Sequence, residues 1–137
     1  MKKRLVLIFI TNIQKYNVKV SVGHTPDSDD AFMFYGMFTG KVTSSDFTVN
    51  HVIEDIEKLN RKATNPELDV TAVSVHACAY IPGYTILRSG GSFGIGYGPI
   101  VTARKNMTID EIKKCKIAIP GKMTSAFLLL QLMIGKF

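Results

Sequence analysis

Strand-like and helix-like segments alternate along this chain, and their order is the feature that most constrains its fold. Residues 18–23 (VKVSVG) alternate apolar and polar side chains and end in glycine, which is typical of a buried strand. Segments 46–53 and 67–75 are rich in β-branched residues, and the second is mostly apolar, as expected inside a parallel sheet. Strands separated by helices predict an α/β fold with a mainly parallel sheet.

Three longer segments carry helix signals. The acids of Asp27–Asp30 suit a cap and a first turn, and the run AFMFYGMF that follows is apolar on nearly every face, which predicts a well-buried helix. Residues 54–65 place Ile56, Leu59 and Ala63 on one side and charges on the other, so they predict an amphipathic helix. Residues 123–137 predict a last helix, apolar on most sides.

Shorter segments complete the pattern. Residues 76–81 predict a short helix that Pro82 stops, and Thr108 with Glu111 forms a capping box that starts another helix. Further strands are expected at 84–89 (YTILRS) and 116–120 (KIAIP), with an extended segment at 100–105.

The glycine-rich residues 90–98 are the best candidate for a crossing between two lobes. We therefore expect a first α/β lobe at 18–98, the start of a second lobe at 99–137, and an N-terminal extension at 1–17. One strand–helix unit after the crossing is too little sheet to bury its helix, so the second lobe is expected to be truncated.

The formal net charge is +6, with an isoelectric point near 9.4. The lysines are scattered, without a basic stripe and interleaved aromatic residues, so the pattern disfavours nucleic acid and fits a small anionic ligand. The two cysteines, Cys78 and Cys115, are far apart, and we expect two buried free thiols in a reducing compartment.

The first 17 residues begin with a basic, apolar run that imitates a secretory signal. No small-residue cleavage site follows it, and the run is too short to span a bilayer. A mis-assigned start, an added segment, an extra strand and a signal all stay open for this extension. Neither a membrane partner nor an oligomeric state is indicated.

The acidic stretch is not a calcium loop. Counting from Asp27, the sixth residue is Phe32 rather than glycine, and the twelfth is Phe38 rather than glutamate. A metal site made by His24 and Asp27 lacks a third ligand, so no metal is expected. A helix cap and a ligand site at the carboxyl end of the first strand remain as alternatives.

The segment PGKMTSAF opens the last predicted helix without the glycine spacing of a phosphate-binding loop. Its hydroxyls, on Thr124 and Ser125, and its exposed backbone N–H groups suit a carboxylate or phosphate, although ordinary capping explains them as well. The glycine-rich residues 90–98 lack the dinucleotide fingerprint. Ser74 and His76 end the third strand but do not form a catalytic triad by themselves.

Several stretches together resemble, in order and spacing, the 1,4-dihydroxy-6-naphthoate synthase family of menaquinone biosynthesis. They are SVGHTPDSDDAFMFYG, EDIEKLNRKA, LDVTAVSVHACAY, LRSGGSFGIGYGPIV and IAIPGKMTSAFLLL. The resemblance runs from about Val18 to Phe137. It implies a type II periplasmic-binding-protein-like fold, in which two α/β lobes close on a ligand, and a cytoplasmic enzyme without a known organic cofactor.

The resemblance also implies an activity and binding residues. Family members of the futalosine pathway convert cyclic dehypoxanthine futalosine to 1,4-dihydroxy-6-naphthoate and release the sugar-derived part, which is lyase chemistry. Ser74 and the pair Ser125–Ala126 match substrate-binding positions, although the family usually has threonine at 125. Further candidate binding residues are Val73, Thr124, His24 and His76, and we expect His24 to face the ligand at the edge of the first lobe.

The family's proposed catalytic base is a histidine that would lie beyond residue 137, so no catalytic residue is expected within the chain. If 137 residues are the whole product, we expect little or no activity. The alternative function is a solute-binding protein or ligand-binding lobe without catalysis, since fold alone does not decide function.

Overall fold

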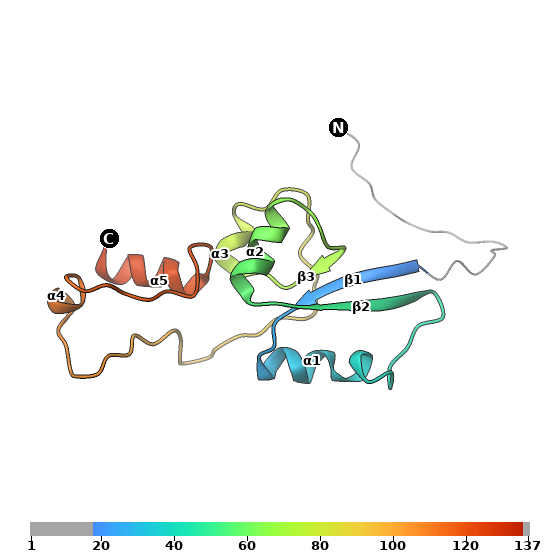
Figure 1. The fold of residues 1–137 in the computed structure, drawn as a ribbon, viewed down its shortest axis with the longest axis horizontal. Helices are drawn as coiled ribbons and strands as arrows, with labels where there is room; N and C mark the ends of the chain where they lie inside the picture. The colour runs from blue at the N-terminus through green and yellow to red at the C-terminus, as the bar shows by residue number, and fades with distance from the viewer. Residues whose placement is uncertain (1–17, 136–137) are drawn as a thin grey trace.

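The computed structural model describes residues 18–135, and its centre is a three-stranded parallel sheet (Figure 1). The strands are β1 (Val18–His24), β2 (Phe47–Ile53) and β3 (Val70–Thr71), in the order β2-β1-β3. The predicted α/β class and parallel sheet are confirmed. The alternatives for residues 1–17 lie outside the described residues.

Between residues 18 and 135, five helices accompany the sheet: α1 (Ser28–Phe38), α2 (Ile56–Thr64), α3 (Val75–Cys78), α4 (Ile109–Ile112) and α5 (Ser125–Ile134). α1 lies on one side of the sheet, and α2 and α3 lie on the other (Figure 1). Side chains of successive residues in a strand point to opposite faces of the sheet, so neighbouring residues of β1 contact helices on opposite sides. The ring of His24 stacks on Phe34 of α1, whereas Gly23 faces Leu59 of α2.

Gly23 is required by the close approach of α2 to the sheet. A Cβ atom at this position would lie 2.6 Å from Leu68 Cδ1, 2.8 Å from Thr71 Oγ1 and 2.9 Å from Leu59 Cδ2. Leu59 and Ala63 are fully buried on the inner face of α2. The amphipathic helix predicted at 54–65 is therefore confirmed, and its apolar face contributes two fully buried residues to the core.

The expectation of a well-buried α1 is wrong. Within this helix Asp30 is the buried residue, and the side chain of Phe32 is 87% exposed. A sheet of three strands can cover one side of a helix, so a helix that is apolar all round leaves its outer side in solvent. α5 shows the same effect, because Leu130 and Ile134 are its buried residues.

Two predicted strands do not form, and one is shorter than expected. Residues 84–89 and 116–120 have no strand structure, residues 100–105 pair with no strand, and β3 is two residues long. A strand needs a neighbouring edge to satisfy its backbone groups. The chain from 84 to 107 leaves the sheet as an irregular connection (Figure 1), so its β-branched residues pair with neither free edge of the sheet.

The capping box at the start of α4 is confirmed. The Thr108 hydroxyl accepts a hydrogen bond from the Glu111 backbone N–H, and the Glu111 carboxylate accepts one from the Thr108 N–H. Both cysteines are free thiols, as expected, but the expectation that they are buried is wrong, because Cys78 is half-buried and Cys115 is exposed. Within residues 18–135 no helix is long and apolar enough to cross a membrane.

Candidate functional site

Two segments that are almost 50 residues apart in sequence meet at the starts of α3 and α5. The backbone N–H of His76 donates a hydrogen bond of 3.2 Å to Ser125 Oγ. The imidazole Nδ1 of His76 lies 3.1 Å from the carbonyl oxygen of Thr124. We call this meeting point the α3–α5 junction and define it by Ser74, His76, Thr124 and Ser125.

Ser74 stands at the N-cap of α3, where it is held by Asn60 of α2. The Ser74 backbone N–H donates to Asn60 Oδ1 at 2.8 Å, and Asn60 Nδ2 donates to Ser74 Oγ at 3.1 Å. Asn60 is fully buried. Two bonds to one residue fix both the backbone and the hydroxyl of Ser74, so this side chain enters the junction in a defined orientation.

Thr124 and Ser125 differ in what their hydroxyls do. Thr124 is the N-cap of α5: its Oγ1 accepts from the Phe127 N–H at 3.2 Å and donates to the Gly121 carbonyl at 2.7 Å. Its hydroxyl is therefore used by the helix start, and its side chain is buried. The Ser125 hydroxyl accepts from His76, which leaves its O–H as a donor toward a ligand.

The contact with Thr124 also determines the proton on the ring of His76. A carbonyl oxygen only accepts hydrogen bonds, so Nδ1 of His76 must carry the hydrogen. In the neutral ring, Nε2 then carries a lone pair. The ring of Tyr80 packs against this imidazole edge-on at 5.3 Å between centroids. The junction therefore combines hydroxyl groups with one imidazole acceptor.

The remaining predicted binding residues divide between the junction and the opposite side of the sheet. Val73 and Ala126 are half-buried and adjoin the junction residues in sequence. His24 is 4% exposed and lies under α1, where its ring stacks on Phe34 at 4.5 Å and bonds to His51. Little of the His24 surface can therefore reach a ligand in this conformation.

The acidic stretch provides no side-chain cap for α1. Asp27 occupies the N-cap position, but its side chain makes no cap hydrogen bond. Instead, the buried carboxylate of Asp30 accepts from the Thr25 N–H at 2.6 Å and from the Thr25 hydroxyl at 2.9 Å. Among the described residues, no group of three or more histidine, cysteine or acidic side chains could hold a metal ion.

Asp29 connects the acidic stretch to the glycine-rich segment. A hydrogen bond from Ser92 lowers the pKa of the Asp29 carboxyl below its usual range. These two residues, with Phe32, Met33 and Gly90–Gly91, line a hollow of about 360 Å³ beside the start of α1. The glycine-rich segment predicted to cross between lobes therefore passes this helix terminus.

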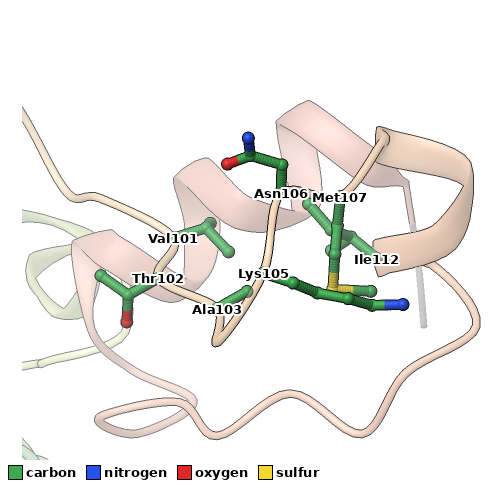
Figure 2. A pocket seen from close by; sticks show the side chains of 7 residues that line it. All are labelled: Val101, Thr102, Ala103, Lys105, Asn106, Met107 and Ile112. Carbon is green, nitrogen blue, oxygen red and sulfur yellow. The ribbon is translucent and has the colours of Figure 1, made fainter.

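A second hollow, of about 380 Å³, lies between the irregular connection and α4 (Figure 2). It is lined by Val101, Thr102, Ala103, Lys105, Asn106, Met107 and Ile112. None of the predicted binding residues lines it. We therefore place the candidate site at the α3–α5 junction.

Sequence reasoning missed two residues that support the junction, Glu57 and Asn60. The charged side chains of this segment, Glu57 among them, were expected on its polar side, and no role was predicted for Asn60, but Glu57 is 8% exposed and Asn60 is 0% exposed. A signal was present for Asn60, because it follows Leu59 and precedes Ala63 on the apolar stripe of α2. A polar residue within an apolar helical stripe is usually buried with a specific partner.

Comparisons with known proteins give a consistent result. The model of the menaquinone biosynthesis family matches residues 20–137. A 1,4-dihydroxy-6-naphthoate synthase of Thermus thermophilus is 38% identical over 112 residues, which are 81% of this chain and 40% of that protein. The enzyme of the same name from Streptomyces coelicolor is 28% identical over 114 residues, 82% of this chain and 39% of its own length.

A solved structure shares the fold as well. A crystallised protein of Archaeoglobus fulgidus superposes with a TM-score of 0.78 at 52% sequence identity. The match covers 85% of this chain and 43% of that protein. The chain thus spans about two fifths of the length of the relatives that it matches.

Proposed function

The chain belongs to the menaquinone biosynthesis family, and from this premise we propose that it binds the substrate of a 1,4-dihydroxy-6-naphthoate synthase. The proposed reaction converts cyclic dehypoxanthine futalosine to 1,4-dihydroxy-6-naphthoate with release of the sugar-derived part, as in the futalosine pathway. This is lyase chemistry, and we assign it to the cytoplasm.

One observation carries the proposal. The residues that resemble the family's substrate-binding positions, Ser74 and Ser125–Ala126, lie on two segments that meet at the α3–α5 junction through the His76–Ser125 hydrogen bond. A carboxylate-bearing substrate suits this place, because the Ser125 hydroxyl and the start of α5 offer hydrogen-bond donors. The net charge of +6 favours an anionic ligand over a cationic one.

We further propose that the chain corresponds to the first lobe and the beginning of the second lobe of a type II periplasmic-binding-protein-like fold. In such a fold, closing the lobes excludes water from the ligand. The reaction needs proton abstraction next to a carbonyl and loss of a leaving group, which is general acid–base work. The binding hydroxyls belong to this chain, and the family's catalytic histidine would lie beyond residue 137.

The test is to incubate the purified protein with cyclic dehypoxanthine futalosine and to follow naphthoate formation by mass spectrometry. In parallel, 1,4-dihydroxy-6-naphthoate is titrated into the protein, and the fluorescence of the naphthoate is recorded. We expect saturable binding that Ser74→Ala and Ser125→Ala weaken. Ser45→Ala is the matched control, because Ser45 is exposed and bonds to its neighbour Asp46.

The outcomes separate the two candidate functions. Binding with turnover supports the synthase. Binding of substrate or product without turnover agrees with either function, because the family's catalytic histidine would lie beyond residue 137, whereas saturable binding of a different solute in place of the substrate would support the solute-binding alternative. Absence of binding for both compounds, in a protein that is folded by circular dichroism, would overturn the proposal.

A further inference from the structure

Helix α2 carries two buried polar side chains, one turn apart, and each reaches a different half of the α3–α5 junction. Glu57 is 8% exposed and Asn60 is fully buried. Residues separated by three positions lie on the same side of a helix. Burial of polar groups is unfavourable unless each finds a hydrogen-bond partner, so the partners of these two side chains reveal what they do.

Asn60 holds the α3 half. Both polar atoms of its amide bond to Ser74, with Oδ1 accepting from the backbone N–H and Nδ2 donating to the hydroxyl. A backbone N–H can only donate, so the orientation of the amide is determined. Neither atom of the amide group therefore needs a ligand to satisfy it.

Glu57 holds the α5 half. Its Oε2 accepts a hydrogen bond of 3.1 Å from the backbone N–H of Met123, one residue before the N-cap of α5. Its Oε1 accepts one of 3.3 Å from Nε of Arg61, whose side chain is 72% exposed. The carboxylate therefore anchors the turn from which Thr124 and Ser125 enter the junction.

Gly121 shows how closely this turn is fitted to Glu57. Its φ of +155° is rarely adopted by residues with a side chain, and a Cβ atom there would overlap the Glu57 carboxylate. The turn can approach the carboxylate because this position is glycine. The hydrogen bond from Met123 and the close approach of Gly121 therefore belong to the same contact between this turn and Glu57.

We propose that Glu57 and Asn60 are positioning residues, which use the rigid spacing of α2 to set Ser74 against Ser125 for substrate binding. This proposal rests on the proposed function. Neither side chain is assigned a catalytic step. Their carboxylate and amide fix the two segments that carry the binding hydroxyls, and a side chain anchored on a helix holds such geometry better than one on a loop.

The binding test compares four variants with 1,4-dihydroxy-6-naphthoate as the probe. Glu57→Ala and Asn60→Ala are each expected to weaken binding about tenfold. A change of this size corresponds to the loss of about one buried hydrogen bond. Glu57→Gln retains an oxygen acceptor for the Met123 N–H and should bind within about threefold of the unchanged protein, since an ion pair whose cationic partner, Arg61, is 72% exposed is screened by water and contributes little. Lys58→Ala is the control, because Lys58 lies on the outer face of α2 with its side chain 68% exposed.

Amide hydrogen exchange provides a readout that needs no ligand. Glu57→Ala should accelerate exchange at Met123 while Ser74 stays protected, and Asn60→Ala should do the reverse. General destabilisation would instead accelerate both positions together with β1, and that result would overturn the positioning role. A loss of binding in Glu57→Gln as large as in Glu57→Ala would also overturn it, because it would mean that the charge contacts the ligand.

The two proposals fail in different ways. If the unchanged protein does not bind the naphthoate, the proposed function fails, and the exchange pattern still decides whether the two side chains hold the two segments. If the unchanged protein binds it and Glu57→Ala and Asn60→Ala bind equally well, the proposed function survives and the positioning proposal is wrong.

Discussion

Nε2 of His24 and Nδ1 of His51 lie 3.0 Å apart on neighbouring strands, beneath α1. Nδ1 of His24 faces the carbonyl oxygen of Thr25 at 3.2 Å, so this nitrogen carries a hydrogen. In the neutral His24 ring, Nε2 must then accept, and His51 Nδ1 donates to it. The remaining nitrogen, His51 Nε2, is a buried acceptor without a hydrogen-bond partner among the described residues.

This arrangement predicts that acid destabilises the protein. Burial, and secondarily the nearby His24, lower the pKa of His51 below its usual 6.5. The unfolded chain therefore binds a proton at higher pH than the folded one. The stabilising contribution is complete above about pH 6.5 and is lost as the pH falls through the folded pKa. Urea midpoints should fall between pH 7.5 and pH 5.

The control is direct titration of the three histidines by their Cε1–H signals in proton NMR, assigned with single His→Gln variants. His51 should titrate below 6.5, and His51→Gln should show a smaller decrease of the urea midpoint on acidification. A His51 midpoint at or above 6.5 would contradict the arrangement.

Two phenylalanines of α1 should differ in their effect on stability. Phe34 stacks on His24, whereas Phe32 is 87% exposed. We expect Phe34→Ala to lower the free energy of unfolding by about 1–3 kcal/mol, through lost packing. Phe32→Ala should change it by less than about 0.5 kcal/mol. Equal losses in urea denaturation would show that the outer side of α1 is covered.

The close approach at Gly23 predicts that even one methyl group is too large there. Gly23→Ala would press on Leu59 and Leu68, so the free energy of unfolding should fall by about 1–3 kcal/mol or more. Gly98→Ala is the matched control: a Cβ there meets nothing within 4 Å, and a change within about 0.5 kcal/mol is expected. Thermal unfolding of both variants measures the difference, and similar melting temperatures would refute the packing.

Ser21 and Asp69 join β1 to the entry of β3 through reciprocal hydrogen bonds. The Asp69 carboxylate accepts from the Ser21 N–H at 2.8 Å and from its hydroxyl at 2.6 Å, and the Asp69 N–H donates to Ser21 Oγ at 2.9 Å. Ser21→Ala and Asp69→Asn should each cost about 1 kcal/mol or less at this exposed place. A double-mutant cycle should reveal coupling, and strict additivity would argue against the contact.

The same contact has a pH signature of the usual carboxylate kind. Hydrogen bonds from Ser21 lower the pKa of Asp69 below 3.8. Its contribution is therefore present above about pH 4 and is lost as the pH falls through the folded pKa. In Ser21→Ala, the Asp69 pKa measured by carbon NMR should rise toward 3.8. An unchanged value would contradict the contact.

Local sequence signals determined much of this fold. The alternation at 18–23, the apolar stripe of 54–65 and the capping box of Thr108 each depend on neighbours in the chain, and the corresponding elements form where they were predicted. The periodicity of side chains reports which face of an element is apolar. It does not report whether a partner covers that face, which is why α1 was expected to be buried.

The tertiary structure decided the rest. Segment 84–89 has strand composition but pairs with neither edge strand of the sheet, so it stays irregular. Glu57 was expected on the charged face of its helix and Asn60 was given no role, yet the fold brings Met123 to Glu57 and Ser74 to Asn60 across 66 and 14 residues of sequence. The sequence alone pointed to Ser74 and Ser125 separately. The meeting of their two segments depends on long-range hydrogen bonds, such as that from His76 to Ser125, which no periodicity within one segment can encode.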